Sequence, residues 1–177
     1  EYRGEVFISS WDGEAVKVYK YDMNSKSSEM LFSFPQKSAR VSYLSVSAQY
    51  IAVIDKDNKN IKVYNRGSGS VSAKQLSGLK QVNNILFLPD GCLLVTGHDN
   101  MKDMINKYSI VSEEEEPVLI WSCDQVPNAR GVAVDERGLI YVSRMKNKTL
   151  YILSAEGKYN TIKSTIIIYS VFIMINH

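Results

Sequence analysis

The 177-residue sequence contains few of the residue types from which catalytic and metal sites are most often built. Its two cysteines, Cys92 and Cys123, are 31 positions apart and belong to no CxxC motif or Cys/His cluster. This favours two thiols in a reducing compartment, and therefore a cytoplasmic protein, over a disulfide or a zinc site. The two histidines are His98, in an expected loop, and His177, the last residue. Because a nucleophile needs both a base and an orienting acid, we expect the chain not to be an enzyme.

An excess of charge of one sign is also lacking, since 21 basic residues oppose 19 acidic ones for a net charge of +2. Composition therefore selects neither nucleic acid nor a membrane as partner. The longest apolar run, Thr165–Asn176, is too short for a transmembrane helix. We expect residues 165–177 to be a non-native terminus or a stray strand rather than a membrane anchor. No glycine-rich phosphate loop opens a helix, so we expect no cofactor.

What the sequence does contain is an internal repeat. Four apolar triplets begin 45, 42 and 47 positions apart: Val6-Phe7-Ile8, Ile51-Ala52-Val53, Leu93-Leu94-Val95 and Ile140-Tyr141-Val142. A second apolar segment follows each triplet after 10 to 12 residues, starting near Val16, Ile61, Ile105 and Leu150. Short β-branched and aromatic segments separated by turn residues predict antiparallel strands, and no helical period competes with them.

A unit of four short strands in about 45 residues is typical of a β-propeller blade. We therefore predict an all-β fold with four blades, covering about 1–38, 39–80, 81–126 and 127–164. A six-bladed ring of this period needs about 270 residues, so the predicted propeller is incomplete. An alternative calcium loop at Asp55–Asn60 lacks the glycine and the downstream glutamate of such loops, and a side-chain-stabilised turn explains it better.

The fourth repeat resembles the NHL repeat, a blade type of six-bladed propellers. The matching positions are Gly131-Val132-Ala133-Val134-Asp135, Gly138, Ile140-Tyr141-Val142, Asn147 and Gly157. The chain is similar to the C-terminal propellers of tripartite-motif ubiquitin ligases. This resemblance implies a module that recognises a protein partner or ubiquitination substrate, with RNA as an alternative partner. RING and B-box cysteine patterns are absent, so ligase activity is not expected in this chain.

The expected binding surface is the propeller face that carries the loops between second and third strands and between successive blades. This face is mildly basic, and the opposite face is acidic. The candidate binding residues on it are Lys56, Lys59, Arg130, Arg144, Lys146, Lys148 and Trp11. Basic side chains there would contact RNA phosphates, although few aromatic residues accompany them for base stacking. A protein-docking face and a merely solvated rim are the alternatives.

A propeller hydrolase or lyase with an axial metal is the rival from another functional class. The positions that could face the axis are Ser10, Asp55, Gly97 and Arg144. This set is poor in metal ligands, so we expect no metal and no small-molecule substrate. The run Glu113–Glu116 is interpreted as a solvated hairpin loop.

Overall fold

The computed structural model describes residues 5–37, 43–100, 102–144 and 149–162, and these form an all-β structure. The strands in chain order are β1 (Val6–Trp11), β2 (Ala15–Asp22), β3 (Ser27–Pro35), β4 (Leu44–Val46), β5 (Tyr50–Asp55), β6 (Asn60–Asn65), β7 (Val71–Lys74), β8 (Gln81–Phe87), β9 (Leu93–His98), β10 (Asp103–Ser109), β11 (Val118–Cys123), β12 (Ala129–Val134), β13 (Ile140–Arg144), β14 (Thr149–Leu153) and β15 (Tyr159–Ile162). No helix long and apolar enough to cross a membrane occurs among the described residues. The tail 165–177 lies outside them, so the expectations for it stay predictions.

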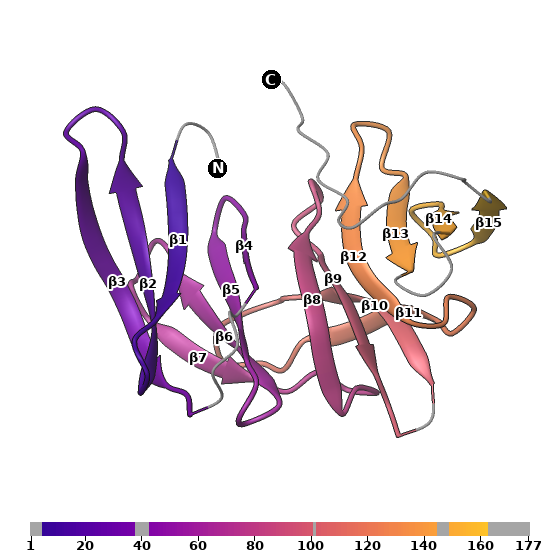
Figure 1. Cartoon of the computed structure of the whole chain (residues 1–177), viewed down its shortest axis with the longest axis horizontal. Helices are drawn as coiled ribbons and strands as arrows, with labels where there is room; N and C mark the ends of the chain where they lie inside the picture. Colours follow the sequence, from indigo (N-terminus) through magenta and orange to yellow (C-terminus); the bar gives the residue numbers. More distant parts are fainter. Residues whose placement is uncertain (1–4, 38–42, 101, 145–148, 163–177) are drawn as a thin grey trace.

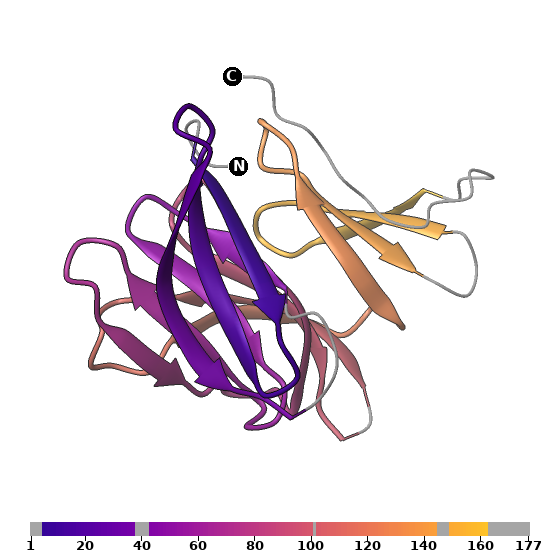
Figure 2. The ribbon, with the colours of Figure 1, turned by 60° about the vertical axis from the view of Figure 1, so that its left-hand side comes forward.

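The strands form four small antiparallel sheets that follow one another along an arc (Figure 1). Among the described residues, three sheets have four strands each, in the orders β4–β7, β8–β11 and β12–β15, and the first sheet has three, β1–β3. On the inside of the arc, the first strand β8 lies against β4 on one side and against β12 on the other. Each sheet is a blade, so the predicted all-β, incomplete propeller is confirmed. Figure 2 shows the last blade set off from the first across the open side of the arc.

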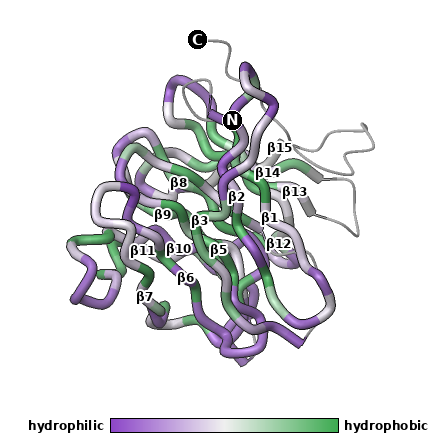
Figure 3. Tube along the Cα trace, turned by 90° about the vertical axis from the view of Figure 1, so that its left-hand side faces the viewer, coloured by the Kyte–Doolittle hydropathy of each residue, from purple (hydrophilic) through white to green (hydrophobic). Residues whose placement is uncertain are grey.

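The hydrophobic core is divided into the spaces between neighbouring blades. Side chains of a strand point alternately to its two faces, and both faces of an inner blade are covered. In β5, Ile51 and Val53 pack toward the first blade, whereas Ala52 and Ile54 pack toward the third. All six residues of β5 are therefore buried, and its apolar run is continuous rather than alternating. Figure 3 shows apolar residues concentrated along the strands.

The turn after β5 confirms the interpretation of Asp55–Asn60. The Asp55 Oδ1 atom accepts a hydrogen bond from the Asn58 backbone N–H at 3.1 Å, and Lys59 has a positive φ of 55°. This is the turn geometry in which an aspartate side chain replaces a backbone acceptor.

The expectation of a solvated loop at Glu113–Glu116, here called the acidic loop, is wrong in part. Glu113 accepts hydrogen bonds from Asn65, Ser68 and Ser70 of the second blade. Glu116 accepts one from the Gln75 backbone N–H at 2.8 Å. The acidic loop therefore joins the third blade to the second, a contact between segments about 40 residues apart that local sequence cannot reveal.

Candidate functional site

Two of the predicted binding residues, Trp11 and Lys56, are linked through Gln36 on the predicted binding face of the first two blades. This face, which carries the loops between second and third strands and between successive blades, is here called the loop face. The Trp11 indole N–H donates to the Gln36 backbone carbonyl at 2.9 Å, and the Gln36 side-chain oxygen accepts from the Lys56 backbone N–H at 3.3 Å. Gln36 is fully buried, so the two hydrogen bonds that it accepts hold the Trp11 side chain and the Lys56 backbone in place. Trp11 is 37% exposed, and Lys59 is exposed in the adjoining turn.

The other predicted cations are less fully described. Arg130 lies in β12 and Arg144 in β13, where the backbone of Ala129 pairs with that of Arg144. Lys146 and Lys148 lie outside the described residues. The basic cluster of these four residues stays a prediction.

The proposed axial positions do not form a metal centre in the part of the chain that the structure describes. Asp55 has a fully buried side chain whose Oδ2 atom lies 3.2 Å from the Lys62 Nζ atom and 2.8 Å from the Asn58 Nδ2 atom. Its carboxylate therefore stabilises the fold through its contacts with Lys62 and Asn58. No group of three His, Cys, Asp or Glu side chains suited to a metal occurs among the described residues. The residues present do not fit an axial metal of the kind the rival hypothesis requires.

A different polar site lies at the loop-face end of β8, which sequence reasoning missed. The register between β8 and β9 shifts between Val82 and Asn84, so Asn83 is an extra residue in a β-bulge. Bulges often re-aim a side chain beside a functional site. Asn83 and Asn84 are both half-buried. The signal in the sequence is an Asn-Asn pair at the start of an inner strand, where only apolar residues are expected.

Gly97 on β9 makes this close strand approach feasible. A Cβ atom added there would lie well inside van der Waals contact of the Gln81 carbonyl oxygen and 3.2 Å from the Leu79 Cδ2 atom. Glycine is the residue used where two backbones come this close. The axial position assigned to Gly97 is thus explained by packing between β8 and β9.

His98 follows Gly97 and pairs with Gln81, the first residue of β8. Its Nδ1 atom lies 2.8 Å from the Asp99 backbone carbonyl oxygen. A carbonyl oxygen only accepts, so Nδ1 carries the proton, and in the neutral ring Nε2 keeps a free lone pair. The Lys80 backbone N–H also donates to the His98 carbonyl at 3.0 Å and fixes the strand end. The bulge residues and His98, here called the axial polar site, thus share one end of one strand pair.

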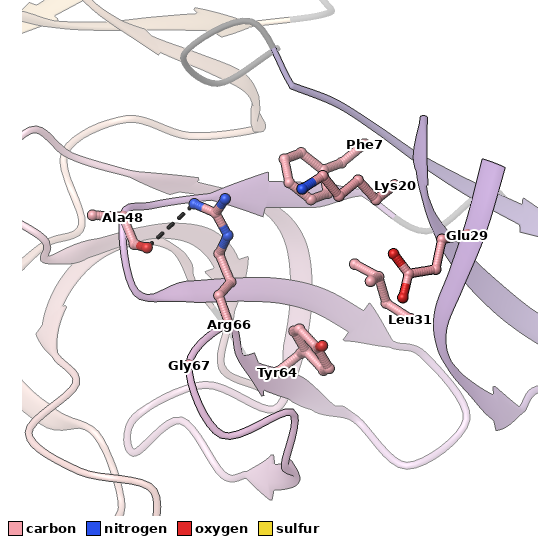
Figure 4. A pocket seen from close by; sticks show the side chains of 8 residues that line it. All are labelled: Phe7, Lys20, Glu29, Leu31, Ala48, Tyr64, Arg66 and Gly67. Carbon is pink, nitrogen blue, oxygen red and sulfur yellow. Dashed lines mark hydrogen bonds between the residues drawn. The ribbon is translucent and has the colours of Figure 1, made fainter. Parts of the chain in front are cut away.

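A pocket of about 480 Å³ opens on the opposite face, between the first and second blades. Its lining residues are Phe7, Lys20, Glu29, Leu31, Ala48, Tyr64, Arg66 and Gly67 (Figure 4). The Arg66 guanidinium lies 5.2 Å from the centroid of the Phe7 ring and donates to the backbone carbonyls of Ser47 and Ala48 at 2.9 and 3.2 Å.

The two cations of this pocket converge on a single carboxylate. Arg66 forms an ion pair with Glu5, and the Lys20 Nζ atom lies 2.5 Å from a Glu5 oxygen. The hydrogen bond from Lys20 is the main cause that lowers the pKa of Glu5. Because both cations already have an anionic partner and a structural role between blades, this pocket is a weaker candidate than the axial polar site.

Comparisons with known proteins agree with the fold. No protein-family model matches the chain, and no curated protein matches it either. Among solved structures, a protein of unknown function from Bacteroides caccae matches 90% of this chain with a TM-score of 0.55 and 17% identity. A protein from Lactobacillus plantarum matches 92% with a TM-score of 0.66 and 11% identity. A protein proposed to be a gluconolactonase matches 93% with a TM-score of 0.63 and 15% identity.

These likenesses support a propeller fold, and none of the three proteins is described as an NHL or tripartite-motif protein. The chain spans 58%, 53% and 61% of the three structures, respectively. The expectation that the chain is not an enzyme is corrected by the third comparison. A protein with this fold is proposed to be a gluconolactonase. Neither the fold nor the missing RING and B-box patterns therefore exclude enzymatic activity.

Proposed function

We propose that the chain is part of a propeller hydrolase that opens a small lactone or ester at the axial polar site. The observation that carries this proposal is the His98 ring, whose Nδ1–H is held by the Asp99 carbonyl at 2.8 Å so that Nε2 is the basic nitrogen. The likeness to a protein proposed to be a gluconolactonase supports the choice of reaction class. Hydrolysis of an ester carbonyl needs no redox cofactor.

In the proposed mechanism His98 acts as a general base. Its Nε2 atom takes a proton from water while the water oxygen attacks the ester carbonyl carbon. The amide N–H₂ of Asn83 donates to the carbonyl oxygen, which becomes negatively charged in the tetrahedral intermediate. When the intermediate collapses, the carbon–oxygen bond of the leaving group breaks. The proton on Nε2 then passes to the leaving oxygen, and the product is a hydroxy acid or an acid and an alcohol.

The test is lactone hydrolysis by the full chain, measured in a pH-stat with glucono-δ-lactone after subtraction of spontaneous hydrolysis. Removing the base by His98→Gln should lower kcat about 10²- to 10⁴-fold. Removing the oxyanion donor by Asn83→Ala should lower it about 10²- to 10³-fold. His177→Gln and Asn24→Ala are the matched controls, since Asn24 lies in the turn after β2 on the opposite face. A rate equal to the spontaneous one, or equal rates for His98→Gln and His177→Gln, would overturn the proposal.

A second candidate function is favoured by the contact between Trp11, Gln36 and Lys56. An exposed indole held by a buried glutamine beside lysines is the kind of rigid anchor that protein interfaces use. This candidate keeps the NHL-like recognition of a protein partner, with RNA as the alternative. A photo-crosslinking residue at position 56 should capture a partner that is lost in Trp11→Ala, whereas the same residue at position 158, on the opposite face, should not. If the captured partner is RNA, its yield should fall steeply with salt.

A further inference from the structure

Two cations from different blades bind one carboxylate at the pocket between the first two blades. Lys20 belongs to β2 of the first blade, and Arg66 follows β6 of the second. Both line the pocket, and both contact the Glu5 carboxylate, with 2.5 Å between the Lys20 Nζ atom and a Glu5 oxygen. Charge-assisted hydrogen bonds of this kind are stronger than neutral ones. The two cations therefore form a carboxylate site at the interface between the blades.

Arg66 is held in place by contacts other than Glu5. Its backbone N–H donates to the Gln49 carbonyl at 2.8 Å, and its guanidinium donates to the carbonyls of Ser47 and Ala48. The guanidinium also lies 5.2 Å from the centroid of the Phe7 ring. The Arg66 side chain is 20% exposed, so salt screens its charge less than that of a surface cation. A cation that is already ordered loses little conformational entropy when it binds an anion.

The rest of the pocket is largely apolar. Phe7 and Leu31 line it from the first blade, and the half-buried Tyr64 ring lines it from the second. The Tyr64 ring stacks on Phe32 with 5.2 Å between the ring centroids, which fixes its orientation. Figure 4 shows Tyr64 and Leu31 in the same pocket as the two cationic side chains. Its volume of about 480 Å³ suits a small molecule, which would need a carboxylate and a compact apolar body.

The charges of the pocket decide how such a ligand would enter. Two cations, Lys20 and Arg66, face two carboxylates, those of Glu5 and Glu29. A third carboxylate beside them would leave an excess of negative charge and would be repelled. A ligand carboxylate that replaces the Glu5 carboxylate keeps the charge balance and both ion pairs. The Glu5 side chain is 28% exposed, so a change of rotamer can turn it toward solvent.

We propose that this pocket binds a small carboxylate with an apolar body, and that Glu5 is a built-in competitor for the carboxylate position. Ligand binding and the inter-blade ion pairs of Glu5 then exclude each other. The inference concerns the face opposite the axial polar site and does not depend on the proposed hydrolase activity.

The probe is phenylacetate, whose binding to the full chain is measured by isothermal titration calorimetry at pH 7. Phenylacetamide, which has the same shape without the charge, is the control ligand. Glu5→Gln removes the competing carboxylate and should lower the Kd for phenylacetate about ten-fold, because the apparent Kd rises as the fraction of binding-competent chains falls.

Lys20→Met tests the cation in the Glu5→Gln background, and it should raise the Kd about ten-fold or more. Lys17→Met in the same background is the matched control and should leave the Kd unchanged. Lys17 lies in the same strand, points to the opposite face and pairs with Asp12 at 2.7 Å.

Nuclear magnetic resonance on the unmodified chain tests the site without any variant. Titration with phenylacetate should shift the ring resonances of Tyr64 and leave those of Tyr151, in the fourth blade, unchanged. Absence of binding by both the original chain and Glu5→Gln, or equal Kd values for the two, would overturn the proposal. Equal binding of phenylacetamide, equal effects of Lys20→Met and Lys17→Met, or shifts confined to Tyr151 would also overturn it. All these measurements report binding alone, so their outcome is separate from that of the lactone assay.

Discussion

Replacement of Gly97 by alanine should destabilise the protein through one backbone contact. The new Cβ atom would overlap the Gln81 carbonyl oxygen, so β8 and β9 must move apart at the end that carries the axial polar site. Overpacking of this kind costs about 1–3 kcal/mol. The lower backbone entropy of the unfolded alanine variant returns about 0.4–1 kcal/mol. The net loss in the free energy of unfolding is therefore about 1–2 kcal/mol.

Urea denaturation measures this loss directly. A chain of this size has an m-value of about 2 kcal/mol per molar urea, so the midpoint should fall by about 0.5–1 M with m unchanged. Gly67→Ala is the matched control. Its Cβ atom would meet only the Asn65 Oδ1 atom, a side-chain atom, at 3.3 Å, and its midpoint should move by less than about 0.3 M.

The outcome that would refute the reasoning is a Gly97→Ala midpoint equal to that of the original chain. It would mean that the two strands separate at no cost and that glycine is not needed for the bulge. A fall in lactone hydrolysis together with the fall in stability would further link the bulge to the proposed site.

Three other predictions concern charges and thiols. Lys74 is 3% exposed, and its Nζ atom donates to two backbone carbonyls of the acidic loop at 2.5 and 2.6 Å. Lys74→Met should therefore lower the free energy of unfolding, measured in urea, by about 1.5–3 kcal/mol. The exposed control Lys158→Met should lower it by less than about 0.5 kcal/mol, and equal midpoints for the two variants would contradict the contact. Burial raises the pKa of Asp90, but the hydrogen bond from Lys107 and the backbone bond from Cys92 outweigh it, so its pKa lies below the usual value. The ionised Asp90 therefore stabilises the fold above pH 4 and loses this effect as the pH falls through its folded pKa, so the midpoint difference between the original chain and Asp90→Asn should shrink from pH 5 to pH 2; a constant difference would contradict it. Burial is the main cause that raises the pKa of the half-buried Cys92 thiol, so iodoacetamide should alkylate Cys92 more slowly than free glutathione at pH 7.5 in the folded protein and at a similar rate in urea.

Much of the fold could be predicted from local sequence. The period of the apolar triplets and the turn residues between them predict short antiparallel strands, because strand formation depends on alternation and turn chemistry within a few residues. The turn at Asp55–Asn58 was predictable for the same reason, since the aspartate bonds to a backbone group three residues on.

The candidate site was less predictable. His98 and Asn83 belong to different strands, and only the register of β8 with β9 brings them to one strand end. The bulge at Asn83 depends on how closely the Gln81 backbone approaches Gly97, which no spacing within either strand expresses. For this reason the sequence places His98 only in a loop, and most of the binding residues predicted from the sequence are lysines and arginines.

The sequence by itself determined an all-β chain of repeated four-strand units, because the apolar period and the turn residues act locally. Only the tertiary structure decided which contacts each four-strand unit makes. It buried Asp55 against Lys62 and joined the acidic loop to the second blade. The contact of the acidic loop depends on which blades pack together, and the period of either segment does not predict packing between segments about 40 residues apart.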